Sequence, residues 1–208
     1  AGFLKQTVLH DQYFHQLLDE YRYLKKKWHL KPMEPHLWKF ARLRPGNFPT
    51  LRIAQFCALI HKSNRLFSHI LDQKHLSHLK SLFEVQPSPY WQTHYRFHKE
   101  TKKTKNALGE SAFQILTINT VVPFLFIYGQ KQNKQEYKER ALDFLLTLPP
   151  EKNTIIDRWK KLGIASQNAY YTQALLQLKN QYCTYKKCLD CQIGNTIISK
   201  TENAGKDP

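Results

Sequence analysis

The sequence predicts an all-α protein, folded as a single irregular multi-helix domain with a C-terminal cysteine loop. Apolar residues recur at intervals of three and four along most of the chain, which is the helical pattern. Only seven glycines in 208 residues leave few of the tight turns that an all-β chain needs. A hydrophobic fraction of 41% is too high for a disordered chain. We expect no sheet larger than a hairpin, placed around Trp38 to Leu43.

The expected domain covers residues 1–198, and the polar stretch 199–208 is expected to be a disordered tail. The numbering begins at Ala1 and the only methionine is Met33, so we interpret the chain as part of a longer protein. There is no run of eighteen apolar residues and no signal-peptide pattern, so we expect no membrane partner. Four unevenly spaced cysteines do not form a disulfide framework and favour a reducing cytoplasm.

The first helix is expected to start at Asp11, a good N-cap, and to end before Pro32. The segment from Pro32 to Pro49 contains four prolines and is expected to be irregular. Thr50 is then expected to cap a second helix. The apolar stripe of that helix consists of Ile53, Ala54, Phe56, Cys57 and Ile60. Cys57 is therefore expected in the core, where cysteine behaves as a small hydrophobe.

Two short helices follow, with a break near Asp72-Gln73, and Pro87 ends the second. The aromatic segment after them holds His94 and His98, which would share one helix face and could hold a metal. No acid or cysteine accompanies them, so a packed aromatic stretch is the favoured interpretation. The basic run from Lys99 to Lys105 is expected to be a mobile surface loop.

The second half of the sequence predicts more helices. Residues 112–128 are apolar nearly all round and contain Pro123, which predicts a kinked core helix. Further helices are expected over 134–148 and 153–162, the latter ending at Gly163. A last long helix, with Ser166 as its N-cap, leads into the cysteine loop.

The charge favours an anionic partner. The formal net charge is +16, and eleven basic residues lie between Tyr21 and Leu71 against the single acid Glu34. Such a charge attracts DNA or RNA to a surface. The alternative is that the lysines only solvate the surface.

Candidate nucleic-acid contacts lie around the turn from Pro45 to Pro49. Arg42, Arg44 and Arg52 flank this turn, which precedes a helix N-terminus that favours anions. Trp38 is close enough in sequence to stack on a base of a single strand. The alternative is that the arginines are structural and tie the irregular segment to carbonyl groups or to the rest of a longer protein.

The candidate metal ligands are Cys183, Cys188 and Cys191, three of the four cysteines within nine positions. Their spacing is typical of a zinc site or an iron-sulfur cluster, with a histidine or no protein group as the fourth ligand. One alternative is a redox-active pair, Cys188 and Cys191, with two lysines nearby to favour the thiolate. The other is that the thiols are free.

No catalytic residue can be assigned. The sequence contains no P-loop, dinucleotide fingerprint, zinc-protease motif or nucleophile elbow. Any activity is expected in another part of a longer protein.

Four segments together resemble the bacterial domain-of-unknown-function family 2851. They are the run from Leu43 to Gln55, the pair Tyr90-Trp91 with His94-Tyr95, the run from Ile118 to Pro123, and the cysteine segment from Tyr182 to Gly194. The resemblance implies that the chain is the C-terminal half of such a protein. The N-terminal half, its expected partner, carries spaced acids similar to a metal-dependent nuclease core.

The expected function is therefore a nucleic-acid-binding accessory part of a nucleic-acid-processing protein. The alternative is a protein-interaction or scaffold domain with structural cysteines.

Overall fold

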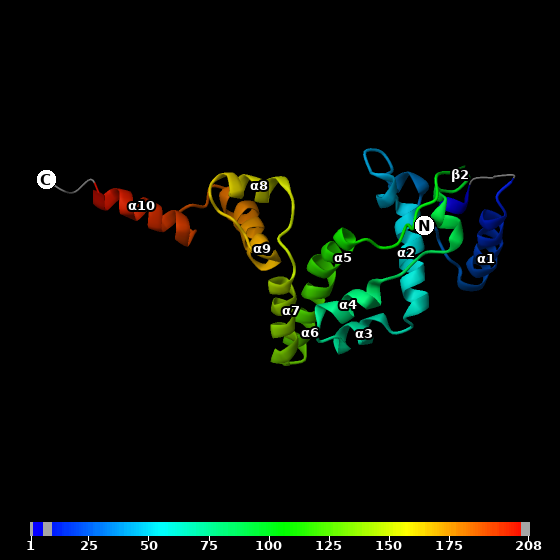
Figure 1. Cartoon of the computed structure of the whole chain (residues 1–208), viewed down its shortest axis with the longest axis horizontal. Helices are drawn as coiled ribbons and strands as arrows, with labels where there is room; N and C mark the ends of the chain where they lie inside the picture. Colours follow the sequence, from blue (N-terminus) through cyan, green and yellow to red (C-terminus); the bar gives the residue numbers. More distant parts are fainter. Residues whose placement is uncertain (1, 6–9, 205–208) are drawn as a thin grey trace. The chain divides into compact units, whose positions relative to one another are not determined.

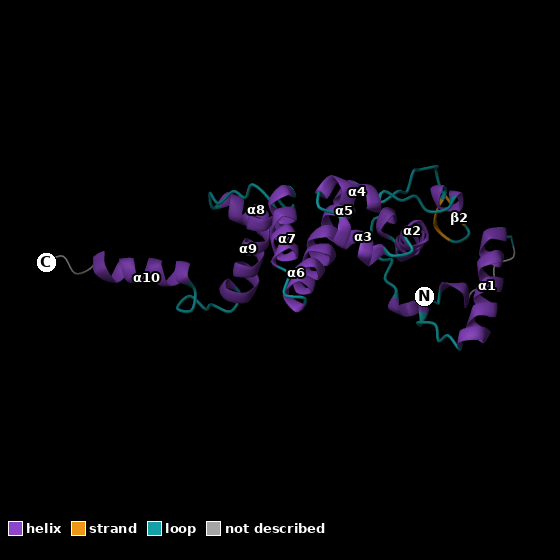
Figure 2. Cartoon of the chain, turned by 90° about the horizontal axis from the view of Figure 1, so that it is seen from below, coloured by secondary structure: helices purple, strands orange, loops and turns teal. Residues whose placement is uncertain are grey.

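A computed structural model describes residues 2–5 and 10–204 of the chain. Helices make up 64% of it, and the strands are confined to one short hairpin (Figure 2). The predicted all-α class is confirmed. The chain divides into two compact units, Ala1–Phe113 and Gln114–Pro208, called unit 1 and unit 2. The single domain predicted over 1–198 stays a prediction, because two compact units can belong to one folding domain.

Unit 1 is built from helices of different lengths joined by irregular segments (Figure 1). Its α-helices are α1 (Gln12–Trp28), α2 (Pro49–Lys62), α3 (Leu66–Asp72) and α4 (Leu76–Phe83), followed at its end by α5 (Glu110–Leu116), which continues into unit 2. Its 3-10 turns are η1 (Phe3–Lys5), η2 (Pro35–Leu37), η3 (Pro45–Asn47) and η4 (Pro89–Gln92). Its buried apolar side chains are Phe14, Leu51, Leu59, Leu79, Phe83, Val85, Trp91 and Phe113.

The ends of α1 follow from local signals in the sequence. Asp11 caps the helix by accepting a 2.9 Å hydrogen bond from the backbone N–H of Phe14. His29 adopts the left-handed conformation and ends the helix before Pro32. Both ends were predicted, as was the break between α3 and α4 after Asp72.

The buried face of α2 differs from the predicted one. The buried residues are Thr50, Leu51, Gln55 and Leu59, whereas Cys57 is exposed. Thr50 does not cap the helix, because its hydroxyl donates to the carbonyl of Tyr95. Gln55 donates to the carbonyl of Asn106 over 2.9 Å. Polar side chains can be buried when they are hydrogen-bonded, as Thr50 and Gln55 are here. The helix therefore buries a different face from the predicted one, and the predicted core position of Cys57 is wrong.

The hairpin lies at a different place from the predicted one. It pairs β1 (His94–Arg96) with β2 (Lys99–Glu100) in antiparallel orientation, and no strand occurs among the described residues from Trp38 to Leu43. Arg42 has a φ of 61°, which turns the chain there and prevents an extended run.

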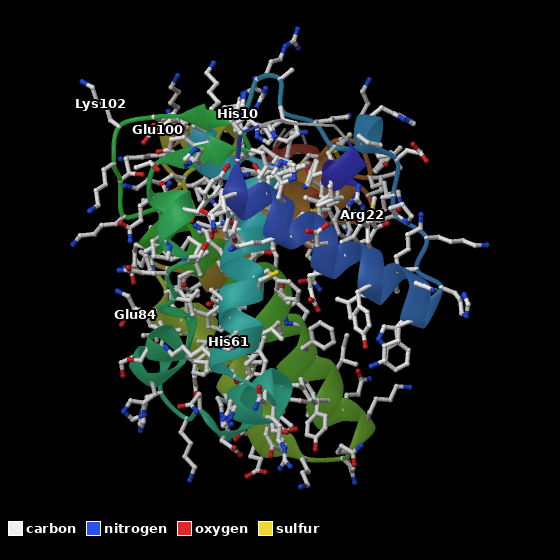
Figure 3. All side chains as sticks on the ribbon, turned by 90° about the vertical axis from the view of Figure 1, so that its right-hand side faces the viewer. His10, Arg22, His61, Glu84, Glu100 and Lys102 are labelled. Carbon is white, nitrogen blue, oxygen red and sulfur yellow. The ribbon has the colours of Figure 1, made fainter. Side chains whose placement is uncertain are left out.

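The basic loop after the hairpin is anchored at two backbone points. The N–H groups of Thr101 and Thr104 donate to the carbonyls of Thr93 and Gln92, each over 2.7 Å. Lys102 lies between these points and extends away from the ribbon (Figure 3). The loop is therefore fixed at its base while its lysine side chains face solvent.

Unit 2 contains α6 (Val122–Lys131), α7 (Gln135–Thr147), α8 (Thr154–Lys161), α9 (Ala169–Gln177) and α10 (Gln192–Ala204), with π-helical turns η5 (Thr117–Val121) and η6 (Leu178–Cys183). Helix α7 contacts both α6 and α9. The buried apolar residues are Ile118, Val121, Val122, Leu125, Ala141, Phe144, Leu145, Leu148, Ile156 and Ala169.

Near the kink predicted within 112–128, the structure has the π-helical turn η5, which ends two residues before Pro123. Proline lacks the N–H that would bond to the carbonyl four residues earlier, so the series of helical hydrogen bonds is interrupted there. The helical run Glu110–Lys131 is long and apolar enough to cross a membrane by length and composition alone. The same test is passed by core helices of soluble proteins, and 39% of its most apolar window is buried.

The remaining helix ends agree in part with those predicted from the sequence. Gly163, with a φ of 83°, follows the end of α8 as predicted. The N-cap of α9 is Asn168 rather than Ser166, because the Asn168 side chain accepts from the N–H of Tyr171. Helix α10 continues to Ala204, into the range 199–208 that was expected to be a tail, and residues 205–208 lie outside the described part.

Candidate functional site

The cysteine segment folds as a turn between η6 and α10. The turn is closed by a hydrogen bond from the N–H of Cys191 to the carbonyl of Cys188 over 3.3 Å. A Cβ at Gly194 would come within 2.5 Å of that same carbonyl oxygen, so only glycine fits there. Cys183 and Cys188 are exposed and Cys191 is half-buried, all as free thiols.

The three predicted metal ligands are not gathered into a binding group. Among the residues that the structure describes, no set of three or more His, Cys, Asp and Glu side chains is placed to hold a metal ion. A tetrahedral site needs three or four converging ligands. Zinc or an iron-sulfur cluster at Cys183, Cys188 and Cys191 therefore stays a prediction based on spacing.

The arginines around Pro45 have two different environments. Arg42 and Arg44 are exposed, on the segment that leads into η3. Arg52, on the first turn of α2, donates to Asn47 Oδ1 over 2.6 Å and to Gln55 Oε1 over 2.8 Å. Burial lowers the pKa of its guanidinium from the ordinary value. Arg52 thus ties the turn to the helix, which is the structural role considered from the sequence.

Arg96 completes this region, although the sequence did not single it out. Its guanidinium carbon lies 4.4 Å from the ring centroid of Phe40 and 4.6 Å from that of Phe48, within cation-π distance of both. Arg42 and Arg44 lie in the short segment between these two phenylalanines. The hairpin therefore brings a third exposed arginine to the segment that carries the other two.

A cavity of about 310 Å³ lies beside Arg96. Trp38, Phe40 and Arg96 contribute to its lining, and Trp38 packs on Phe3 with the ring centroids 5.3 Å apart. We call Trp38, Phe40, Arg42, Arg44, Phe48 and Arg96 the arginine surface. It combines guanidinium groups with aromatic rings, which is the composition of sites for single-stranded nucleic acid.

A second polar cluster of unit 1 is centred on Asp11. Its carboxylate accepts a hydrogen bond from the hydroxyl of Tyr90 and lies 3.2 Å from Nδ1 of His98. Burial alone would raise the pKa of Asp11, but the hydrogen bonds from Tyr90, Phe14 and His98 outweigh it and lower the pKa. Burial and the hydrogen bond to Asp11 both raise the pKa of Tyr90.

The two histidines of this segment serve packing and hydrogen bonding. The His94 ring stacks on Tyr90 with centroids 3.9 Å apart, and its Nδ1 lies 2.9 Å from the Tyr90 carbonyl oxygen. His98 contacts Asp11 from the hairpin turn. The interpretation of a packed aromatic stretch is confirmed, because His94 and His98 do not share a helix.

A family model described as "Protein of unknown function (DUF2851)" matches residues 1–154. The chain belongs to this family. A search of curated proteins and a search of solved structures gave no significant match.

The DUF2851 match covers the arginine surface and the Asp11 cluster but ends before the cysteine segment. Three of the four segments that carried the resemblance lie within it. The fourth, from Tyr182 to Gly194, lies beyond its last residue.

Proposed function

We propose that this DUF2851 chain binds single-stranded nucleic acid through the arginine surface, as an accessory part of a nucleic-acid-processing protein. The observation that supports it most strongly is the position of Arg96 over Phe40 and Phe48, beside the exposed Arg42 and Arg44. Arg42 and Arg44 contact phosphates, since guanidinium groups bind phosphate oxygens in bidentate fashion. A base enters the neighbouring cavity and stacks on Trp38 or Arg96.

The distribution of charge supports unit 1 as the unit that attracts an anionic strand. Unit 1 contains nineteen of the 32 Lys and Arg residues and eight of the sixteen acids, a net charge of +11. Unit 2 carries the remaining +5. An anionic strand is therefore attracted mainly to the unit that holds the arginine surface.

The test is the salt dependence of binding to a fluorescently labelled oligodeoxythymidine. For the double variant Arg42→Gln and Arg44→Gln we expect weaker binding. The slope of log K against log salt concentration should fall by about 1.4, because each phosphate contact to a single strand contributes about 0.7. The melting temperature should stay unchanged, since both side chains are exposed.

The matched control removes two exposed lysines of α8 in unit 2, Lys160→Gln and Lys161→Gln. It lowers the net charge by the same amount and should leave the slope nearly unaltered. If both double variants change the slope equally, binding follows net charge and the arginine surface is not the site.

We also propose that the cysteine segment holds zinc or an iron-sulfur cluster through Cys183, Cys188 and Cys191. The spacing supports it, together with the turn that Gly194 permits against Cys188. Protein purified without oxygen should contain about one metal site per chain, and a cluster would colour it brown. Cys188→Ala should lose the metal, whereas Cys57→Ala should keep it. A metal-free preparation, or equal metal content in both variants, would contradict the proposal.

A further inference from the structure

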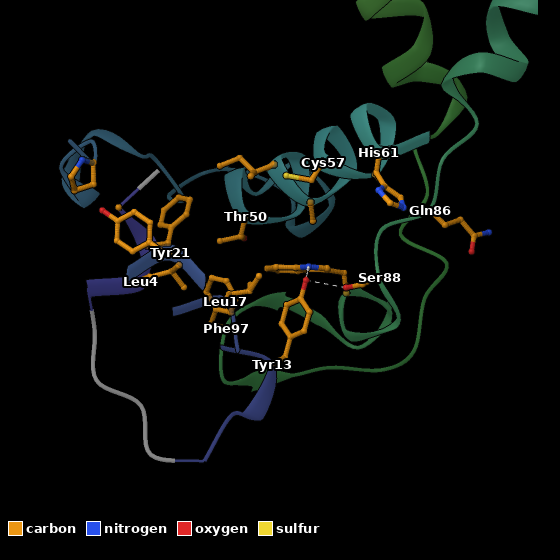
Figure 4. Close-up of a pocket in the computed structure, with 17 residues that line it drawn as sticks. Leu4, Tyr13, Leu17, Tyr21, Thr50, Cys57, His61, Gln86, Ser88 and Phe97 are labelled. Atoms are coloured by element: carbon orange, nitrogen blue, oxygen red, sulfur yellow. Dashed lines mark hydrogen bonds between the residues drawn. The ribbon is translucent and has the colours of Figure 1, made fainter. Parts of the chain in front are cut away.

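The last turns of α1 in unit 1 expose a basic face of the helix. The inner face is formed by Phe14, which is buried, and by Leu17 and Tyr21, which line the cavity drawn in Figure 4. Arg22 follows Tyr21 directly, so a stripe that begins at Arg22 is turned by about 100° around the helix. The members of this stripe are basic, exposed and spaced at intervals of three and four residues: Arg22, Lys25, Lys26 and His29.

These four side chains and Leu30 line a hollow of about 410 Å³. It shares no lining residue with the cavity of the arginine surface or with the cavity of Figure 4. Asp19 pairs with Arg22 over 3.2 Å, whereas Lys25 and Lys26 pair with no acid in the described part of the chain. The hollow is therefore positively charged, and an anion from outside the chain can enter it.

Large apolar side chains are exposed at the same helix end. Trp28 is 64% exposed, and Leu30, which lines the hollow, is 42% exposed. Lys27 Nζ lies 5.3 Å from the centroid of the Trp28 ring, within cation-π distance. By contrast, the aromatic rings of the arginine surface are half-buried. A partner that supplied only phosphate groups would leave Trp28 and Leu30 in water.

An anionic lipid surface matches both the charge and the apolar side chains. Clusters of Lys and Arg on a helix attract negatively charged lipid headgroups. Tryptophan is enriched at the level of the headgroups, where its ring meets apolar chains on one side and water on the other. Four of the five cations within residues 22–31 are lysines, which are hydrated point charges, whereas the arginine surface presents guanidinium groups that match single phosphates. The two surfaces therefore fit different anions.

A purely structural role explains only part of this helix end. Cations in the last turn complement the helix dipole, so Lys25, Lys26 and Lys27 also stabilise α1. The dipole does not account for the exposure of Trp28 and Leu30 beside them.

We propose that unit 1 binds the surface of an anionic membrane through the end of α1. Anionic headgroups occupy the hollow, and Trp28 and Leu30 insert at the level of the headgroups. The proposal departs from the expectation of no membrane partner, because a peripheral contact needs neither a spanning helix nor a signal peptide. It is independent of nucleic-acid binding. The residues that make the contact are called the α1-end surface: Arg22, Lys25, Lys26, Lys27, Trp28 and Leu30.

The test is sedimentation of the whole chain with sucrose-loaded vesicles of phosphatidylcholine that contain about one third phosphatidylserine. We expect binding that weakens as the salt concentration rises, and little binding to vesicles of phosphatidylcholine alone. The double variant Lys25→Gln and Lys26→Gln should lower the partition coefficient about 25-fold, because each cation near such a surface contributes about fivefold.

The matched control is the double variant Lys102→Gln and Lys103→Gln. Both lysines are exposed in unit 1, in the loop 101–109, which exposes no large apolar side chain. This variant loses the same charge and should lower the partition coefficient by less than about threefold. Equal losses in the two double variants, or equal binding to both kinds of vesicle, would show that the proposal is wrong.

Trp28 provides a readout of insertion. Brominated phosphatidylcholine quenches tryptophan fluorescence at short range, so the bound chain should lose part of its emission. Trp28→Phe should keep its binding, because phenylalanine is also apolar, but should lose this quenching. Trp159→Phe, in α8 of unit 2, is the control and should be quenched as the unaltered chain is. Unchanged quenching in Trp28→Phe would contradict the insertion of this side chain.

The lysine variant also separates lipid from nucleic acid. Lys25→Gln with Lys26→Gln should bind labelled oligodeoxythymidine nearly as the unaltered chain does, since the arginine surface is intact. If its affinity for the oligonucleotide falls as much as its affinity for the vesicles, the end of α1 is a further nucleic-acid contact and the lipid proposal is wrong.

Discussion

Arg52 differs from Arg42 and Arg44 because its guanidinium is engaged by protein partners. It joins Asn47 in the turn to Gln55 in α2, and Gln55 itself is buried. We expect Arg52→Gln to lower the free energy of unfolding by about 1–2 kcal/mol, the contribution of two hydrogen bonds. Arg44→Gln should change it by less than about 0.5 kcal/mol, as exposed substitutions do. Urea titration of both variants measures the difference, and equal losses would contradict the structural role of Arg52.

Asp11 links stability to pH. Its pKa in the folded chain lies below the ordinary value of 3.8, so ionised Asp11 stabilises the fold above that pH. This stability is lost as the pH falls through the lowered folded-state pKa. Asp11→Asn keeps an N-cap side chain but removes the charge that faces His98.

We therefore expect Asp11→Asn to be less stable than the unaltered chain at pH 6 by about 1.5–3 kcal/mol, the scale of one hydrogen bond to a charged group. The two proteins should converge in stability as the pH falls below the folded-state pKa. Thermal melts across this range measure the effect. A constant difference at all pH values would show that the carboxylate charge is not responsible.

At the scale of elements, α6 approaches the start of α7 closely at Gly129. A Cβ at Gly129 would lie 2.8 Å from the carbonyl oxygen of Lys134 and 3.1 Å from the backbone nitrogen of Lys138. Gly129→Ala should cost about 1–3 kcal/mol, as overpacking does. Gly109→Ala is the control, because no atom lies within 4 Å of its added methyl. Denaturant unfolding of both should show a loss only for Gly129→Ala.

Helix ends were predicted well where a single residue decides them. Asp11 and Gly163 act through their own side chain or backbone, so neighbouring sequence is enough to recognise them. The buried face of α2 was not predictable in this way. Thr50 and Gln55 are buried only because Tyr95 and Asn106, far along the chain, accept their hydrogen bonds. The spacing of apolar residues along a helix gives no information about such distant hydrogen-bond partners.

At the scale of the whole molecule, the sequence contained some of the residues of the arginine surface in recognisable form and others not. Arg42 and Arg44 are exposed on the segment that leads into the proline-rich turn, and their role in binding stays a prediction. Arg96 was missed, because its place over Phe40 and Phe48 depends on how the hairpin packs against a distant segment. The cysteines were recognised by spacing, but spacing does not determine whether thiols converge.

The π-helical turn η5 affects how related sequences can change in length. A π-helical turn holds one residue more than an α-helical turn, although both complete about one full rotation. Losing one residue from Thr117–Val121 would therefore return the turn to α-helical form and leave the side chains on both sides facing their present neighbours, whereas losing one residue from an α-helical turn would rotate one side by about 100°. We expect single-residue deletions among relatives to be tolerated in this turn and in loops such as 101–109, and to be rare elsewhere within the helices.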